Sequence, residues 1–185
     1  IVDVSLPYTK YSIPVYYIIV PSEDSSNLAR LDGIRYGVRA SGESLTAVYG
    51  NSRADGFPPE VKRRIMVGTY ALSAGYYDAY YRQAQKVRTL IIEDFAKVFA
   101  AVDALITPTS PFPAFALDEK TDDVLAMYAA DVFVSPAAVA GLPAISLPAG
   151  KTKTGLPIGA QIIGPRLAES MVLRLGHQLQ QVHAL

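Results

Sequence analysis

A long amphipathic segment from Asp78 to about Val102 constrains the fold of this chain more than any other feature of its sequence. Its apolar side chains recur at every third or fourth position: Tyr81, Ala84, Val87, Leu90, Ile91, Phe95, Val98 and Phe99. A helix with one apolar face is stable when that face packs against other elements. The segment therefore predicts a long helix that faces a core and begins with Asp78 as its cap.

Short apolar segments that follow this helix are typical of strands. Residues 104–106 precede a proline-rich loop over 108–118, and residues 144–147 and 158–163 flank the sequence Gly150-Lys-Thr-Lys-Thr-Gly155. Apolar segments joined in this way are typical of a β-hairpin. We expect further helices over 13–28, bent at Pro21, over 44–53, capped by Ser44, and over 58–75, 123–132, 136–140 and 167–183. The pattern predicts an α/β or α+β class, and the length suits one domain, or one large piece of a bigger domain, over residues 1–185.

Composition narrows the chemistry that the chain can support. Lys and Arg together number 17, as do Asp and Glu, and this balance argues against a dominant nucleic-acid or membrane footprint. The absence of cysteine excludes disulfides and thiolate metal sites. No apolar run is long enough to span a membrane, and the first residues do not resemble a signal peptide. The two histidines, His177 and His183, do not share a helix face, and we expect His177 to lie in the last turn of its helix.

Ser25 and Ser26 are the serines to consider as nucleophiles. A serine nucleophile needs an adjacent base and an oxyanion hole, and the sequence identifies neither. We favour the alternative that both hydroxyls bond to backbone at a helix end. The sequence also lacks a phosphate-binding glycine loop and a metal-binding His-Glu-x-x-His motif. We therefore assign no catalytic residue and no metal ligand to this chain.

The densest basic cluster is Lys62-Arg63-Arg64. One alternative is that it forms a solvated helix face. From the residues alone this is the favoured interpretation. The alternative is that at least one of the three, with Arg64 as the candidate, faces inward, because consecutive helical residues point about 100° apart. A buried arginine needs a partner.

Asp131 lies among apolar residues, and it is either a solvent-facing helix residue or a buried group that binds a ligand; the sequence leaves both open. Arg64 and Asp131 in one pocket would suit the carboxylate and ammonium groups of an amino acid.

Several longer strings carry a family resemblance. They are Ser25-Ser-Asn-Leu-Ala-Arg-Leu-Asp-Gly-Ile-Arg-Tyr-Gly37, Glu60-Val-Lys-Arg-Arg-Ile65, Gly75-Tyr-Tyr-Asp-Ala-Tyr-Tyr81, Gln85-Lys-Val-Arg-Thr89, Ala140-Gly-Leu-Pro-Ala-Ile-Ser-Leu-Pro-Ala-Gly150 and Gly155-Leu-Pro-Ile-Gly-Ala-Gln-Ile-Ile-Gly164. Over essentially its whole length the chain resembles the A subunits of bacterial glutamyl-tRNA(Gln)/aspartyl-tRNA(Asn) amidotransferases, a branch of the amidase signature family. The resemblance implies the C-terminal part of the amidase signature fold, with helices packed on a mixed sheet of which only some strands are present.

The resemblance also implies a function and its residues. The family hydrolyses glutamine with a Ser–cis-Ser–Lys triad on a signature sequence that these 185 residues do not contain, so we expect the isolated chain to be an inactive fragment. By the same resemblance, Arg64 holds the α-carboxylate of glutamine and Asp131 its α-ammonium. Tyr16, or its neighbour Tyr17, lies near the pocket mouth, and Asn27 and Arg30 line the site or brace its loops.

The implied setting is a cytoplasmic complex with partner subunits B and C. Ammonia from glutamine would be used for ATP-dependent transamidation of Glu-tRNA(Gln) or Asp-tRNA(Asn). ATP and Mg would be used by the partner subunit, tRNA would be met only through the complex, and no cofactor is expected in this chain. Two alternatives stay open: the chain is part of a general small-molecule amidase, or it is a catalytically inactive fold fragment.

Overall fold

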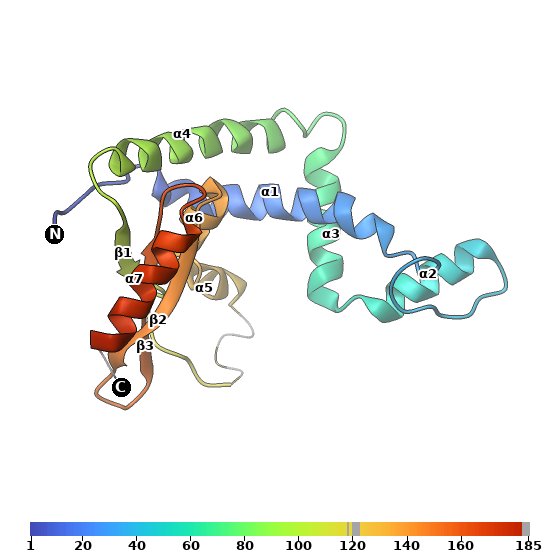
Figure 1. The fold of residues 1–185 in the computed structure, drawn as a ribbon. Helices are drawn as coiled ribbons and strands as arrows, with labels where there is room; N and C mark the ends of the chain where they lie inside the picture. Colours follow the sequence, from blue (N-terminus) through green and yellow to red (C-terminus); the bar gives the residue numbers. More distant parts are fainter. Residues whose placement is uncertain (118, 120–122, 183–185) are drawn as a thin grey trace. The chain divides into compact units, whose positions relative to one another are not determined.

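The computed structural model describes residues 1–117, 119 and 123–182, and the chain divides into two compact units (Figure 1). Unit 1 comprises Ile1–Tyr16 and Lys86–Leu185, and unit 2 comprises Tyr17–Gln85. Two helices, α1 (Ser12–Asn27) and α4 (Tyr81–Phe99), contribute residues to both units. Each unit is described by itself below.

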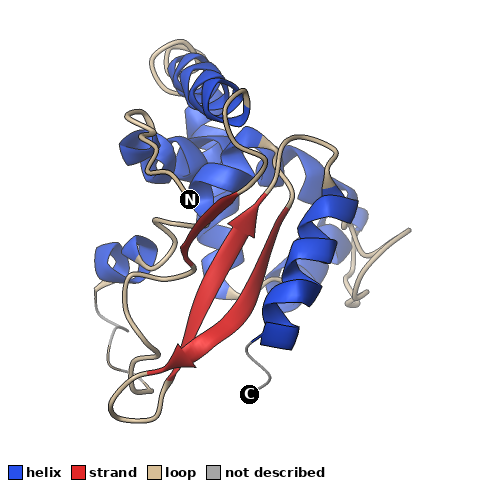
Figure 2. Cartoon of the chain, turned by 60° about the vertical axis from the view of Figure 1, so that its left-hand side comes forward, coloured by secondary structure: helices blue, strands red, loops and turns tan. Residues whose placement is uncertain are grey.

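Unit 1 contains a three-stranded sheet in the order β1-β3-β2, formed by β1 (Leu105–Pro108), β2 (Ala144–Lys151) and β3 (Pro157–Ile163) (Figure 2). The expected β2–β3 hairpin is confirmed. Both pairings are antiparallel, so no parallel pair of the expected mixed sheet forms within the described residues. Strand β2 runs past the predicted end at Leu147. It lies at the edge of this sheet, where a proline such as Pro148 is tolerated. The register of its pairing with β3 shifts between Pro148 and Gly150.

Helix α7 (Glu169–Val182) packs against β2 and β3 (Figure 2). The contact is close at Gly176, where an added Cβ would lie 3.2 Å from Leu147 and 3.4 Å from Ile145. His177 lies exposed before the last turn of α7 and approaches Gln181 at 3.1 Å, so the prediction that it belongs to the last turn is wrong by about one turn. His183 lies outside the described residues.

The long helix α4 is shorter than predicted. It begins at Tyr81, and Asp78 is not its cap: the carboxylate of Asp78 accepts a hydrogen bond from the side chain of Arg82 at 3.1 Å. The apolar stripe is confirmed at Ala84, Ile91 and Phe95, which are buried, but not at Leu90, which is 37% exposed. Asp94 is also buried and accepts the backbone N–H of Tyr8 at 2.9 Å, just before the 3-10 helix η1 (Thr9–Tyr11).

Two short helices complete unit 1: α5 (Val124–Ala129) and α6 (Ser135–Ala140). The helix predicted to reach residue 132 therefore ends at Ala129, and turns occupy residues 130–134. Gly141 adopts a left-handed conformation (φ 71°) after α6, and Arg88 Nε donates to the carbonyl of Val139 at 2.8 Å. Both features satisfy carbonyls at the end of α6. The proline-rich segment is irregular over 109–117 as expected, and residue 118 lies outside the described residues.

Unit 2 is helical. Besides residues of α1 and α4 it contains the 3-10 helix η2 (Leu28–Arg30), α2 (Leu45–Gly56) and α3 (Pro59–Leu72). The predicted cap is confirmed, since Ser44 Oγ accepts the N–H of Ala47 at 3.1 Å. Pro21 lies inside α1 as expected.

No helix in the described part of the chain is both long and apolar enough to cross a membrane.

Candidate functional site

Arg64 lies on the face of α3 that packs against α1. Gly68 follows one turn later on the same face, and an added Cβ at Gly68 would overlap the carbonyl of Pro21 on α1. Glu60 precedes Arg64 by one turn, and Ala71, which is buried, continues the series. Residues spaced by three or four positions share a helix face. This close approach of two backbones directs the Arg64 side chain toward α1.

Glu60 and Tyr17 both contact the guanidinium of Arg64. Its Nε donates to Glu60 Oε1 at 3.0 Å, and its central carbon lies 5.8 Å from the ring centroid of Tyr17 on α1. The Arg64 side chain is 32% exposed, against 51% for Arg63. Lys62 is exposed and donates to the carbonyl of Ala54 at 2.6 Å. Lys62 and Arg63 are thus exposed, as the favoured interpretation expects, whereas Arg64 is half-buried and turned toward α1.

Glu60 forms ion pairs with two arginines, Arg63 and Arg64. Its Oε2 accepts from Arg63, and its Oε1 accepts from Arg64. Burial by itself would raise the pKa of Glu60, but the hydrogen bonds from Arg64 and then Arg63 outweigh it and hold that pKa below its ordinary value. Glu60 therefore stays ionised and keeps accepting from Arg64 at neutral pH.

Asp131 lies in unit 1, in the turn between α5 and α6. Its backbone carbonyl accepts the N–H groups of Val134 and Ser135 at 3.2 and 2.9 Å, so Asp131 begins the turn that leads into α6. The residue is half-buried, and Ser135 and Pro136 beside it are buried. It is therefore neither a solvent-facing helix residue nor a fully buried one.

The sequence predicts that Arg64, Asp131 and Tyr16 share one site. Tyr16 and Asp131 belong to unit 1, whereas Arg64 belongs to unit 2 together with Tyr17. Tyr17 is thus the tyrosine of this pair whose ring lies against Arg64 within unit 2. The pairing of Arg64 with Asp131, and the place of Tyr16 beside it, stay predictions.

Unit 1 also contains a cleft of about 450 Å³ next to the turn that carries Asp131. The hydroxyls of Thr109 and Ser146 meet in it at 2.6 Å, and the rings of Phe112 and Phe115 pack edge to face at 6.2 Å. Ala130, directly before Asp131, also contributes to the wall. Proline, phenylalanine, alanine and isoleucine side chains line the cleft together with the hydroxyl side chains of Thr109, Ser110, Ser146 and Thr152.

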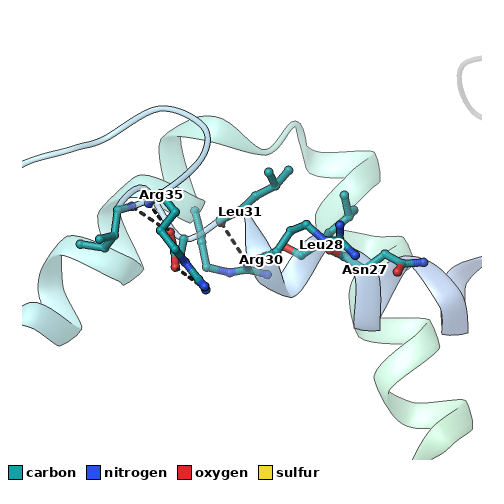
Figure 3. Close-up of polar contacts among 8 residues, drawn as sticks. Asn27, Leu28, Arg30, Leu31 and Arg35 are labelled. Atoms are coloured by element: carbon teal, nitrogen blue, oxygen red, sulfur yellow. Dashed lines mark hydrogen bonds and ion pairs between the residues drawn. The ribbon is translucent and has the colours of Figure 1, made fainter.

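The residues of the Ser25–Gly37 string have structural contacts. The hydroxyls of Ser25 and Ser26 both donate to the carbonyl of Ser22, at 2.9 and 3.4 Å, which confirms the structural alternative to a nucleophile. Arg30 Nε donates to the carbonyl of Asn27 at 3.1 Å. Figure 3 shows this segment, in which Arg35 bonds to Asp32 through backbone and side chain. Arg30 therefore braces the turn after α1.

Groups that could hold a metal ion are a separate question. Within residues 1–117, 119 and 123–182, no three or more His, Cys, Asp or Glu side chains gather in such an arrangement.

Comparison with known proteins decides the family. The sequence model of the amidase family matches residues 1–173. The chain belongs to the amidase family. Among curated relatives, the A subunit of glutamyl-tRNA(Gln) amidotransferase from Maricaulis maris is 58% identical over 180 residues, which are 97% of this amidase chain and 37% of the relative. The protein of the same name from Rhizorhabdus wittichii is 60% identical over 183 residues, which are 98% and 37% of the two chains. The amidase chain thus spans about 37% of the length of these relatives.

Solved structures confirm that the fold is part of the amidase signature fold. The crystal structure of the glutamyl-tRNA(Gln) amidotransferase A subunit from Thermotoga maritima is 42% identical, with a TM-score of 0.64, and the match covers 92% of this amidase and 32% of that chain. A crystal structure described simply as an amidase is 25% identical, with a TM-score of 0.70, and covers 96% and 36% of the two chains.

The sequence analysis does not identify Glu60 as a partner of Arg64, and it names Tyr17 only as an alternative to Tyr16. The sequence marks Glu60 only as an acid in the first turn of a helix, although its spacing of four residues from Arg64 is the one at which opposite charges meet on a helix. Tyr17 is expected only as an alternative to Tyr16. No sequence signal distinguishes the two tyrosines, because their order around α1 relative to α3 depends on where the helices cross at Pro21 and Gly68.

Proposed function

We propose that this amidase chain is the glutamine-binding and scaffold part of an amidotransferase A subunit. The proposal rests on the orientation of Arg64. Its side chain is turned toward the interface of α3 with α1 and contacts Glu60 and Tyr17 there. Holding a rotamer-rich arginine in one orientation costs conformational entropy. Binding a carboxylate ligand would offset this cost, since a guanidinium with a fixed orientation can bind a carboxylate through two parallel hydrogen bonds.

The proposed ligand is the amino-acid head group of glutamine. Arg64 binds the α-carboxylate, and Asp131, in unit 1, binds the α-ammonium; Tyr16 lies at the mouth of the pocket. The match to A subunits at 58% and 60% identity supports this choice of ligand over a simple amide, which has no head group to bind. The hydrolytic residues of the proposed enzyme lie on the Ser–cis-Ser–Lys signature, which this chain does not contain.

The proposed setting is the one that the relatives' name indicates. An amidotransferase A subunit would hydrolyse glutamine and supply ammonia to partner subunits B and C in the cytoplasm. Those partners would use ATP and Mg to amidate Glu-tRNA(Gln) or Asp-tRNA(Asn), and tRNA would reach this chain only through the complex. The residues of this chain contribute substrate binding and the scaffold around it.

A hybrid A subunit tests the proposal. In this hybrid, residues 1–185 follow the N-terminal portion of the Maricaulis maris relative, and the protein is co-expressed with that organism's partner subunits. We expect Arg64→Ala and Asp131→Ala each to lower kcat/KM for glutamine. Each loss should correspond to roughly 2–5 kcal/mol of transition-state stabilisation, because each variant removes the protein's charged group from one of the two proposed ion pairs with the head group. Acetamide serves as the matched substrate without a head group.

The two substrates separate the outcomes. If both variants hydrolyse glutamine as the unsubstituted hybrid does, neither residue binds the head group and the proposal is wrong. If the unsubstituted hybrid prefers acetamide to glutamine, the chain belongs to a general small-molecule amidase.

A further inference from the structure

A row of three polar residues crosses the sheet of unit 1 on the face opposite α7. Gln161 on the central strand β3 pairs in register with Thr107 on β1 and with Ser146 on β2. Residues directly opposite one another in a sheet point to the same face. Ile145 and Leu147, on either side of Ser146 in the sequence, lie on the other face, next to α7. The polar row is therefore turned away from α7, with Gln161 at its centre.

Gln161 is buried although its side chain is polar. It is 4% exposed, and burying an amide is costly unless its groups form hydrogen bonds. Its Nε2 has two N–H donors, and this nitrogen donates to Thr107 Oγ1 at 3.1 Å and to the backbone carbonyl of Phe133 at 2.9 Å. Thr107 Oγ1 in turn donates to the carbonyl of Pro108 at 3.2 Å. This series of hydrogen bonds fixes the orientation of the Gln161 amide.

Phe133 belongs to the turn over residues 130–134 that carries Asp131. Hydrogen bonds within this turn are local: the carbonyl of Asp131 accepts the N–H groups three and four residues later, at 3.2 and 2.9 Å. Such bonds define the shape of the turn but not where it lies on the sheet. The bond from Gln161 joins positions 28 apart in the sequence. Gln161 thus ties the turn to the central strand, two residues after Asp131.

We propose that Gln161 is a positioning residue that holds the backbone of the Asp131 turn in place for the α-ammonium group of the substrate. This inference rests on the proposed function, in which Asp131 binds that ammonium. Because the tie acts through the Phe133 carbonyl, it determines where the Cα and Cβ atoms of Asp131 lie, whichever groups the carboxylate contacts. A misplacement of about 1 Å can cost roughly a hundredfold in rate. Loss of the tie therefore weakens recognition of the ammonium although Asp131 itself is unchanged.

The experiment uses the hybrid A subunit with two substrates, glutamine and glutaramate, which is glutamine without its α-ammonium group. Gln161→Met retains the length of the side chain but removes both donors. We expect it to lower the ratio of kcat/KM for glutamine to that for glutaramate roughly tenfold, mainly through KM for glutamine, as for the loss of one hydrogen bond. A purely structural defect would reduce the amount of folded enzyme, lower both values alike and leave the ratio unchanged.

Thr107→Val is a second, milder variant. It removes the acceptor that orients the Gln161 amide but keeps the Phe133 carbonyl as its partner, so the ratio should fall by roughly two- to threefold. Hydrogen–deuterium exchange of peptides that cover residues 130–135 follows the turn directly. Exchange there should accelerate in Gln161→Met and, to a smaller extent, in Thr107→Val. Circular dichroism verifies that each variant is folded, and Thr107→Val decides the outcome if Gln161→Met does not fold.

Asp94→Ala is the matched control. Asp94 is also buried in unit 1, and its carboxylate also bonds to a distant backbone group, the N–H of Tyr8 at 2.9 Å. Its removal leaves the polar row and the tie to Phe133 in place, so the ratio should change by no more than about twofold. A ratio in Gln161→Met that stays within the range of this control overturns the positioning role. Unchanged exchange of residues 130–135 overturns it as well.

Asp131→Ala separates this inference from the proposed function. If Asp131→Ala lowers the ratio and the variants at Gln161 and Thr107 do not, Asp131 binds the ammonium without positioning by Gln161. If Asp131→Ala leaves the ratio unchanged, Asp131 does not bind the ammonium, and both the proposed function and this inference fail.

Discussion

At the scale of single residues, the orientation of Arg64 depends on Gly68, one turn further along the same face of α3. Gly68 lets the backbone of α3 approach α1 at Pro21 so closely that even a methyl group would overlap the Pro21 carbonyl. Arg64 lies one turn before Gly68 on the same face, and its aromatic partner Tyr17 lies one turn before Pro21 on α1. The crossing therefore determines which arginine of the basic cluster faces inward and which tyrosine it meets.

We predict that Gly68→Ala destabilises the protein by about 3 kcal/mol or more, because the backbone carbonyl that the methyl group meets cannot move aside without separating the helices. Gly50→Ala is the matched control in the same unit. Gly50 lies within α2 with no atom within 4 Å of an added Cβ, so alanine should stabilise the helix by roughly 0.5–1 kcal/mol. Urea unfolding followed by circular dichroism measures both changes, and similar midpoints for the two variants would contradict the prediction.

Whether a contact of the candidate site can be predicted from the sequence depends on how far apart its residues lie along the chain. The spacing of Glu60 and Arg64 is local, so the ion pair can be inferred from sequence once α3 is recognised. Asp131 is identifiable from its apolar surroundings, but the sequence predicts helix for the turn that holds it. The crossing of α1 and α3 joins segments about 45 residues apart, as Gly68 and Pro21 show, and no local pattern encodes such a contact.

At the scale of elements, the segment between α3 and α4 forms a turn where the local sequence predicts the start of a helix. Asp78 precedes an amphipathic run and so predicts a helix cap. The structure instead places a turn there, with Gly75 at φ 88° and the N–H of Tyr80 bonded to the carbonyl of Tyr76 at 2.9 Å. The rings of Tyr70, Tyr76 and Tyr80 lie 4.3 to 6.2 Å apart, centroid to centroid. This aromatic cluster replaces the first helical turn that the sequence predicts.

The tyrosine cluster leads to a prediction about pH. A hydrogen bond with Tyr76, and then desolvation, raise the pKa of Tyr70 to about 12 from an ordinary value of 10.0. Because the folded-state pKa is the higher one, the stability that Tyr70 contributes is complete below pH 10 and is lost as pH rises through about 12. We expect Tyr76→Phe to lower the pKa of Tyr70 toward its ordinary value.

Carbon-13 NMR of the tyrosine Cζ atoms resolves Tyr70 from the other eleven of the 12 tyrosines. Tyr77→Phe is the control, because the ring of Tyr77 packs on Tyr81 at 5.4 Å and is not among the rings that cluster with Tyr70. A Tyr70 titration that is the same in Tyr76→Phe and Tyr77→Phe would show that the hydrogen bond does not set its pKa.

The regular elements are predictable where periodicity is long enough. Helices α3 and α4 and the β2–β3 hairpin follow directly from apolar spacing and turn residues. The errors lie at the ends, where α4 starts two residues late and α5 stops at Ala129. Helix ends depend on which backbone groups find partners outside the helix, such as the Val139 carbonyl that Arg88 satisfies from another element.

At the scale of the whole molecule, the chain spans about 37% of the length of its curated relatives. Its described serines at 25 and 26 donate to backbone, and exposed His177 meets Gln181. Neither arrangement joins a nucleophile to a base. The proposed site contributes a cation and an anion, which would stabilise a bound amino acid but would not break an amide.

We therefore predict that residues 1–185 alone release no ammonia from glutamine, while the same residues in the hybrid A subunit do. The physical reason is that binding groups without a nucleophile cannot lower the barrier of the chemical step. An ammonia assay coupled to glutamate dehydrogenase measures both proteins under identical conditions. The hybrid with Arg64→Ala controls for the contribution of this chain, since its activity should fall although the whole signature sequence is present. Turnover by residues 1–185 alone, abolished by a serine-directed reagent, would mean that this chain contains a nucleophile of its own.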